Sequence, residues 1–234
     1  MDNGVTNFEN AHATACIDAT VWIEGTDRHV AVHKGYRWWT AAHDTGGKTC
    51  AGIASKWYED EKAAGLPSHR SVIALWSFVE GCEAQGVVPH PGGSEDEQTL
   101  YKRLIGLVRD VYQPLYWDEM RCGSLPDHWR VRWSLFDCSV NFGVPTASRW
   151  VQGMVGAKID GDVGNKTVGA ICAFVQDKGP DRFNQAIRNL RQNHAHFLGE
   201  KYSHQVPNVR GWVNRADKVA EQAVLHDADT GDPA

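Results

Sequence analysis

Apolar residues recur at intervals of three and four positions along most of this chain, which is the spacing of one face of an α-helix. The first such stretch covers residues 6–24, where Thr6 or Asn7 can serve as the N-cap and Gly25 ends the pattern. The same spacing predicts further helices over residues 53–64, 71–85, 94–117, 129–142, 145–154, 168–176, 181–202 and 211–223. The chain is therefore expected to be mainly α-helical.

The pattern changes between Arg28 and Trp39. Residues 29–32 and 36–39 read as two short strands, and residues 33–35 between them are suited to a tight turn. Residues 86–93 and 159–167 are rich in glycine and proline or in turn-forming polar residues, so they are expected to be loops. The predicted fold is mainly α with one small β-hairpin near the start of the chain.

Charge and hydropathy exclude some classes of partner. The chain has 24 Lys and Arg against 29 Asp and Glu, a formal net charge of −5. Because phosphate binding relies on clustered Lys and Arg, no nucleic-acid partner is expected. This charge also provides no long-range attraction to an anionic wall polymer. No apolar run approaches the roughly 18 residues of a membrane helix, so no transmembrane segment is expected, and no secretory signal is visible.

The cysteine pattern argues against a zinc site. The six cysteines form no C-x-x-C pair, and no metal or cofactor is expected. Apolar helical surroundings, as at Cys138, favour a buried free thiol. Disulfides in an oxidising compartment stay open as an alternative.

Candidate chemistry lies in two pieces, Glu24-Gly25 and the segment from Asp44 to Thr49. Cleavage of a glycosidic bond needs a proton for the leaving oxygen and stabilised charge at the sugar carbon. Burial at the end of an apolar helix would raise the pKa of Glu24, as a general acid requires. Asp44, in a glycine turn, would stay ionised, and Thr49 could hold a water molecule. The alternatives are a solvated helix-end carboxylate at Glu24 and turn residues that only satisfy backbone groups.

Sugar-binding residues can also be proposed. Aromatic faces stack on sugar rings, which makes Tyr36, Trp38 and Trp39 candidates for a binding subsite. Asp137 and Asn141 are four positions apart on one helix face, where both can bond to sugar. Equally, these two side chains can tie neighbouring helices together.

The pattern resembles the motif E-G-G-Y-x-x-x-x-x-D-x-G-G-x-T-x-x-G-I of glycoside hydrolase family 108, a family of bacterial and phage N-acetylmuramidases. The second half matches at Asp44, Gly46, Gly47, Thr49, Gly52 and Ile53. In the first half an insertion separates Glu24-Gly25 from Gly35-Tyr36. The resemblance implies that Glu24 is the catalytic glutamate, because it follows the helix. A rival alignment places His33-Lys34 there and implies an inactive protein.

The second half of the chain resembles the later blocks of the same family in order. The matching blocks are Leu115-Tyr116-Trp117, Leu125-Pro126, Leu135-Phe136-Asp137 with Val140-Asn141, Trp150-Val151-Gln152, Asp160-Gly161 with Val163-Gly164, and Gly211-Trp212 with Asn214-Arg215. The resemblance implies a lysozyme-like catalytic part over residues 1–110, with the hairpin beside the cleft. It also implies a predicted peptidoglycan-binding part over residues 111–225. The terminal residues 226–234 are expected from their sequence to be a flexible tail.

The resemblance further implies hydrolysis of the β-1,4 bond between N-acetylmuramic acid and N-acetylglucosamine in peptidoglycan. The expected setting is a phage endolysin or a virion-associated lysin, made in the cytoplasm and acting on the wall after release or export, with phage structural proteins as further partners. The alternative is a wall-binding or structural module of the same fold that has lost catalysis. A metal-dependent amidase or peptidase is a third alternative, which is disfavoured because the sequence lacks the required spacing of metal-binding residues.

Overall fold

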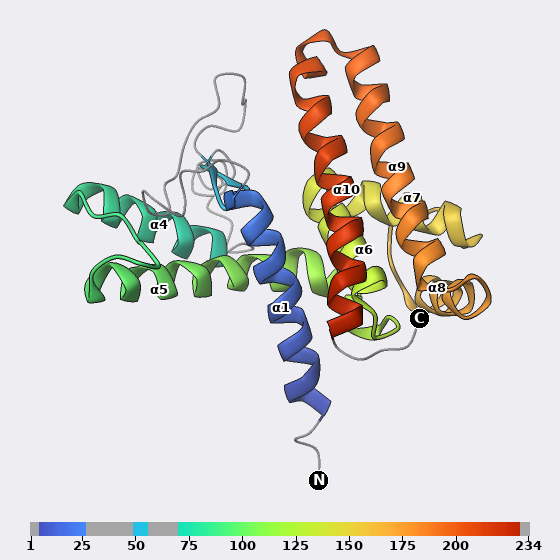
Figure 1. Cartoon of the computed structure of the whole chain (residues 1–234), viewed down its shortest axis with the longest axis horizontal. Coiled ribbons are helices and arrows are strands. Elements are labelled where there is room, and N and C mark those ends of the chain that lie inside the picture. Colours follow the sequence, from blue (N-terminus) through green and yellow to red (C-terminus); the bar gives the residue numbers. More distant parts are fainter. Residues whose placement is uncertain (1–4, 27–48, 56–69, 230–234) are drawn as a thin grey trace. The chain divides into compact units, whose positions relative to one another are not determined.

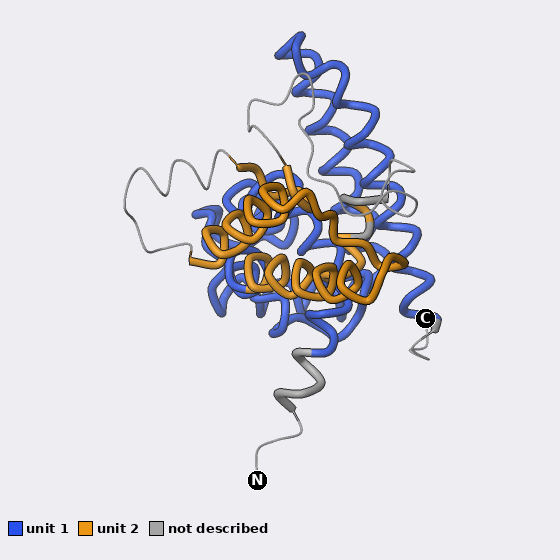
Figure 2. The backbone as a smooth tube through the Cα atoms, turned by 90° about the vertical axis from the view of Figure 1, so that its left-hand side faces the viewer, with its two compact units in different colours: residues 1–16, 114–234 blue, residues 17–113 orange. Residues whose placement is uncertain are grey.

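The computed structural model describes residues 5–26, 49–55 and 70–229, and the described chain is mainly helical with one two-stranded hairpin (Figure 1). The predicted mainly α fold with a small hairpin is thereby confirmed. The chain forms two compact units, coloured separately in Figure 2: unit 1 comprises residues 1–16 and 114–234, and unit 2 comprises residues 17–113. The strands predicted over 29–32 and 36–39 lie outside the described residues.

Unit 2 contains the second half of α1 (Val5–Thr26), the strands β1 (Thr49–Cys50) and β2 (Ile53–Ala54), and the helices α4 (Arg70–Gln85) and α5 (Glu95–Tyr112). Helix α5 begins with a capping box, in which the Ser94 hydroxyl accepts from the Glu97 N–H and the Glu97 carboxylate accepts from the Ser94 N–H. Helices α4 and α5 pack against each other. Their buried apolar side chains include Val72, Leu75, Trp76, Val79, Leu104, Val108 and Val111.

The hairpin turns tightly. Thr49 pairs with Ala54 and Cys50 with Ile53, so only Ala51 and Gly52 form the turn. Both turn residues have positive φ, 49° and 79°, as in the tight turns that suit a twisted two-stranded ribbon. The prediction of a helix from residue 53 is therefore wrong at its start, because Ile53 and Ala54 belong to β2. The rest of that predicted helix, from residue 56, lies outside the described residues.

Unit 1 is a bundle of helices built around α6 (Trp129–Phe142), which is buried along most of its length. Its other elements are a π-helix (Gln113–Asp118), a short 3₁₀-helix (Cys122–Ser124), α7 (Val144–Val155), α8 (Asn165–Lys178), α9 (Pro180–Lys201), another 3₁₀-helix (Ser203–Gln205) and α10 (Val206–Asp229). Helices α9 and α10 run side by side in opposite directions and both pack on α6 (Figure 1). The π-helix includes Pro114, which has no N–H to donate to a regular α-helical turn.

The end of α10 caps the start of α6. His128, at the N-cap position of α6, makes no capping hydrogen bond with its side chain. The buried Asp227 carboxylate instead accepts from the backbone N–H groups of Trp129, at 2.6 Å, and Arg130, at 3.2 Å. His226 stacks on the Trp129 ring with centroids 4.1 Å apart. The prediction of a flexible tail from residue 226 is therefore wrong for residues 226–229. The Asp227 carboxylate satisfies N–H groups at the N-terminus of α6, which holds the end of α10 in place.

Candidate active site

Glu24 lies in the last turn of α1, two residues before the helix ends at Thr26. Ile17, Thr20 and Val21 precede it by seven, four and three positions, and all three are buried. These three residues form part of the buried face of α1, and Glu24 follows them in the last turn of the helix. Its side chain is outside the described part of the structure.

An ion pair fixes this half of α1 to α5. The Arg109 guanidinium donates to both carboxylate oxygens of Asp18, with Nε 2.7 Å from Oδ1 and Nη2 2.5 Å from Oδ2. Both side chains are about two-fifths exposed. The hydrogen bond to Asp18 also raises the pKa of Arg109, so the guanidinium keeps its charge. The planar, bidentate geometry sets the orientation of α1 as well as its distance from α5.

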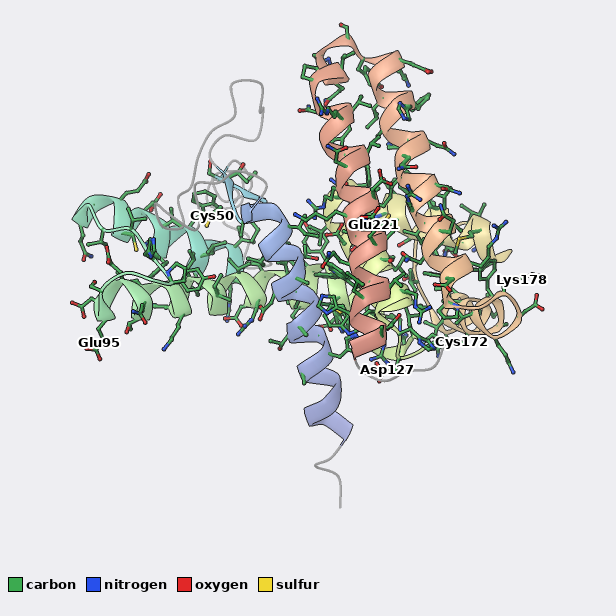
Figure 3. All side chains as sticks on the ribbon, in the orientation of Figure 1. Cys50, Glu95, Asp127, Cys172, Lys178 and Glu221 are labelled. Atoms are coloured by element: carbon green, nitrogen blue, oxygen red, sulfur yellow. The ribbon has the colours of Figure 1, made fainter. Side chains whose placement is uncertain are left out.

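A second contact fixes the hairpin to α5. The buried Tyr112 hydroxyl donates to the Ala51 carbonyl at the tip of the turn. Thr49, the predicted water-holding residue, is half-buried in β1, two residues before that turn. The neighbouring Cys50, labelled in Figure 3, is fully buried, and burial together with Cys82 raises the pKa of its thiol to about 12. This thiol is therefore a packing group rather than a nucleophile.

Both anchors belong to the same helix. Arg109 and Tyr112 are three positions apart, so α5 presents them on one face. Through them, unit 2 holds the end of α1 and the hairpin, the two parts of the sequence motif, on one scaffold. Asp44, Tyr36, Trp38 and Trp39 lie outside the described residues, so their predicted roles stay predictions. The anchors were not found from the sequence, since Asp18 and Arg109 are 91 positions apart and no local pattern joins them.

The structure places Asp137 and Asn141 in unit 1. Asp137 is 0% exposed and accepts from Arg191 and Arg215, each with an Nη2 to oxygen distance of 2.7 Å. Burial raises the pKa of Asp137, but the two guanidinium groups outweigh burial and lower it to about 2. Asn141 accepts from Arg191 at 3.3 Å. This arrangement ties α6 to α9 and α10, and it favours the helix-tying alternative over direct sugar binding by Asp137.

Two family models match the chain in succession. The model described as glycosyl hydrolase 108 matches residues 28–143, and the model described as predicted peptidoglycan domain matches residues 146–217. The first match begins after Glu24. The structure of SagA from Brucella abortus is similar, with a TM-score of 0.55 and 18% sequence identity over 92% of this chain and 95% of that chain. At this identity the likeness shows the fold alone. No curated protein matches the sequence.

A mainly helical chain with one small hairpin and two successive matches of this kind has the architecture of a lysozyme-like peptidoglycan hydrolase. The chain belongs to the glycosyl hydrolase 108 family, and a peptidoglycan-binding region follows its glycosyl hydrolase region. Membership supports a glycoside hydrolase that acts on peptidoglycan. Among the described helices, none has the length and apolar character needed to cross a membrane. The boundary between a catalytic part and a binding part at residues 110 and 111 stays a prediction. The compact units divide after Gln113, and the match to the glycosyl hydrolase model ends at residue 143.

Proposed function

We propose that the protein is an N-acetylmuramidase that cleaves the β-1,4 bond between N-acetylmuramic acid and N-acetylglucosamine. Glu24 donates a proton to the leaving oxygen. The Asp44 carboxylate stabilises the positive charge at the sugar carbon, and the Thr49 hydroxyl holds a water molecule. The observation that carries this proposal is the attachment of both parts of the motif to α5, by Arg109 to Asp18 and by Tyr112 to the Ala51 carbonyl.

This attachment supports catalysis because an acid and its assisting groups must keep a fixed separation around the scissile bond. Helix α5 is a rigid element, and its two anchors are one helical turn apart. Glu24 follows Asp18 by six residues in α1, and Thr49 precedes Ala51 by two residues in the hairpin. Glu24 and Thr49 are thus each a short distance along the chain from an anchor.

The test is the substitution Glu24→Gln, which keeps the shape of the side chain and removes its acid. We expect release of reducing sugar from purified peptidoglycan to fall at least about a hundredfold, the typical contribution of a general acid. Glu83→Gln, at an exposed glutamate of α4 in the same unit, is the matched control and should retain activity. Circular dichroism melting establishes that both variants fold. A Glu24→Gln variant that lyses walls as fast as the wild type would refute the role of Glu24.

Product analysis tests the bond that is cleaved. The digest is reduced with borohydride and hydrolysed, and the sugar alcohols are separated by mass. A muramidase leaves muramic acid at the new reducing ends, so muramitol should accumulate. Glucosaminitol would instead identify a glucosaminidase. New amino groups without new reducing ends would identify an amidase or peptidase. Inhibition by a chelator would then show that this enzyme depends on a metal.

A second candidate function is a wall-binding or structural module that has lost catalysis. The match to the glycosyl hydrolase model begins at residue 28 and leaves Glu24 outside, which favours the alignment with His33-Lys34 in the position of the glutamate. Sedimentation with insoluble peptidoglycan separates the two functions. Retention on the pellet without any new reducing ends would select the binding module.

We also propose that the protein is made in the cytoplasm and reaches the wall by release or export, as a phage endolysin or a virion-associated lysin. All six cysteines, which lie in the described residues, are free thiols, and this fits synthesis in a reducing compartment. Immunoblots of cell fractions and purified virions during phage growth distinguish the two settings. An endolysin stays in the cell until lysis, whereas a virion-associated lysin co-purifies with particles and their structural proteins.

A further inference from the structure

Five rings from four helices gather in unit 1. They are Phe142 of α6, Trp150 of α7, His194 and Phe197 of α9, and Trp212 of α10, and we call them the ring cluster. His194 is at its centre, with ring centroids 4.8 Å from Trp150, 5.5 Å from Phe142 and 5.9 Å from Phe197. Phe142 also contacts Trp212, at 6.1 Å. Four of the five members lie within residues 146–217, the part that matches the predicted peptidoglycan domain.

The ring cluster differs from the core of unit 1 in its exposure. Trp133, a core tryptophan of α6, is 1% exposed, whereas Trp150 and Trp212 are half-buried and Phe197 is 48% exposed. Neither Trp150 nor Trp212 makes a hydrogen bond through its indole N–H to any residue that the structure describes. Large, partly exposed rings whose N–H donors have no partner among the described residues are suited to a ligand that has both apolar faces and carbonyl oxygens.

The aromatic surface continues along α9 to the end of the helix. The Lys201 ammonium lies 5.4 Å from the centroid of the Phe197 ring and 5.2 Å from that of Tyr202, which is 40% exposed. The ring cluster and Tyr202 therefore form an extended surface from α7 to the α9–α10 connection. An extended row of rings can contact several successive units of a polymer, as aromatic rows do in other polymer-binding proteins.

A polar group lies next to the ring cluster on three of its helices. Asn141 precedes Phe142 in α6, Arg191 is one turn before His194 in α9, and Arg215 is one turn after Trp212 in α10. Arg191 is 1% exposed, and its Nε–H has no acceptor among the residues that the structure describes. The hydrogen bonds of Arg191 and Arg215 to Asp137, and of Arg191 to Asn141, tie the three helices together and fix the spacing of the rings they carry.

We propose that the ring cluster is a binding subsite for the glycan strand of peptidoglycan, separate in sequence from the Glu24 motif. The apolar faces of N-acetylated sugars stack on Trp150 and Trp212, whose N–H groups donate to acetyl carbonyl oxygens. Phe197 and Tyr202 contact the next sugars along the strand. The proposal rests on peptidoglycan as the substrate, and it assigns the subsite to particular residues of the peptidoglycan-binding region.

The test measures binding of the full-length protein to purified insoluble peptidoglycan by sedimentation. Trp150→Ala, Trp212→Ala and Phe197→Ala should each weaken binding about tenfold, which corresponds to about 1.4 kcal/mol. Phe174→Ala is the matched control, because Phe174 is a half-buried ring of α8 in the same unit that pairs with Phe183. It should bind as the wild type does. Wild-type affinity in all three cluster variants would overturn the proposal.

A second measurement avoids any loss of folding in the tryptophan variants. In the wild-type protein, the indole N–H resonances of Trp150 and Trp212 are assigned by Trp→Phe substitution and followed by NMR. The added probe is the disaccharide of N-acetylglucosamine and N-acetylmuramic acid. Both resonances should shift on titration, and that of Trp133, in the core, should not. Titration to saturation with no change at either indole would likewise overturn the proposal.

The failure of this subsite and the failure of the proposed function give different results. Loss of binding in the cluster variants, with no reducing sugar released by the wild type, would reject the muramidase and retain the subsite. Hydrolysis abolished by Glu24→Gln, with unchanged binding in every cluster variant, would retain the muramidase and reject the subsite.

Discussion

Asp137 offers a sharp test of the structure, because its two candidate roles predict opposite phenotypes. A sugar-binding carboxylate can be replaced by asparagine with little effect on folding and a loss of binding. A helix-tying carboxylate cannot be replaced without leaving two guanidinium groups, Arg191 and Arg215, buried without their anion. The structure supports the second role, since Asp137 is 0% exposed and both arginines are less than a tenth exposed.

The size of the effect follows from the burial and the pairing. Removing one partner of a buried ion pair costs about 3–5 kcal/mol. The pKa gives a second measure: it is lowered from 3.8 to about 2 in the folded protein. At about 1.36 kcal/mol per pKa unit, this shift corresponds to roughly 2–3 kcal/mol of stability. The two values agree in order of magnitude, so we expect Asp137→Asn to lower the free energy of unfolding by about 3 kcal/mol.

The sign of the pH dependence follows from the lowered pKa. The contribution of Asp137 is fully present above its unfolded pKa, near 4, and is lost as the pH falls toward about 2. Urea unfolding of the wild type and Asp137→Asn at several pH values between about 2.5 and 7 measures the difference. The gap between the two proteins should narrow toward low pH. A variant with wild-type stability at pH 7, or a gap independent of pH, would refute the helix-tying role.

Three further outcomes are expected. Asp227→Ala removes the cap of α6 and an ion pair of the buried Arg130. It should lower the free energy of unfolding by about 2–4 kcal/mol in urea titrations, and a change below about 0.5 kcal/mol would contradict the capping role. Gly52→Ala places a side chain at φ 79° and should cost about 1–2 kcal/mol by thermal melting, whereas an unchanged melting temperature would argue against this turn. Cys50 should resist thiol reagents at pH 8 until the protein unfolds, and rapid labelling of the native protein at this residue would contradict its burial.

Local sequence patterns predicted most of the helices. The apolar spacing located α4 to within one residue, and Ser94 with the following acids marked the start of α5. Gly143 was expected to end α6, and it does so with a φ of 83°, a conformation that few other residues adopt. These features depend on residues within one or two turns of each other, which is why the sequence alone reveals them.

Contacts between distant residues were not predictable in the same way. Asp227 was assigned to a flexible tail from its place near the chain end. Its capping role could not be predicted, because its partner, the Trp129 N–H, is 98 positions away. Likewise, the apolar spacing that starts at Ile53 predicts a helix, but Ile53 and Ala54 pair with the strand β1. Family resemblance supplied some of the missing information. It grouped Asp137 and Arg215 as members of two separate blocks, and the structure joins those blocks by an ion pair.

The two anchors on α5 allow the proposed active site to be tested without touching a catalytic residue. Arg109→Leu removes a half-exposed ion pair, which contributes at most about 1 kcal/mol to stability. Tyr112→Phe leaves the Ala51 carbonyl without its donor and should cost about 1–3 kcal/mol. Each variant should nevertheless lose about tenfold in kcat on peptidoglycan, because either loss frees one part of the motif.

The double variant separates the effect on catalysis from the effect on folding. If both anchors act only by holding the two parts of one site together, freeing the second part adds little once the first is free. The loss of kcat in the double variant should then be close to that of the worse single variant, while the losses of unfolding free energy roughly add. Losses of kcat that multiply would mean that the anchors act independently. In that case α5 would not be the common scaffold of Glu24 and Thr49.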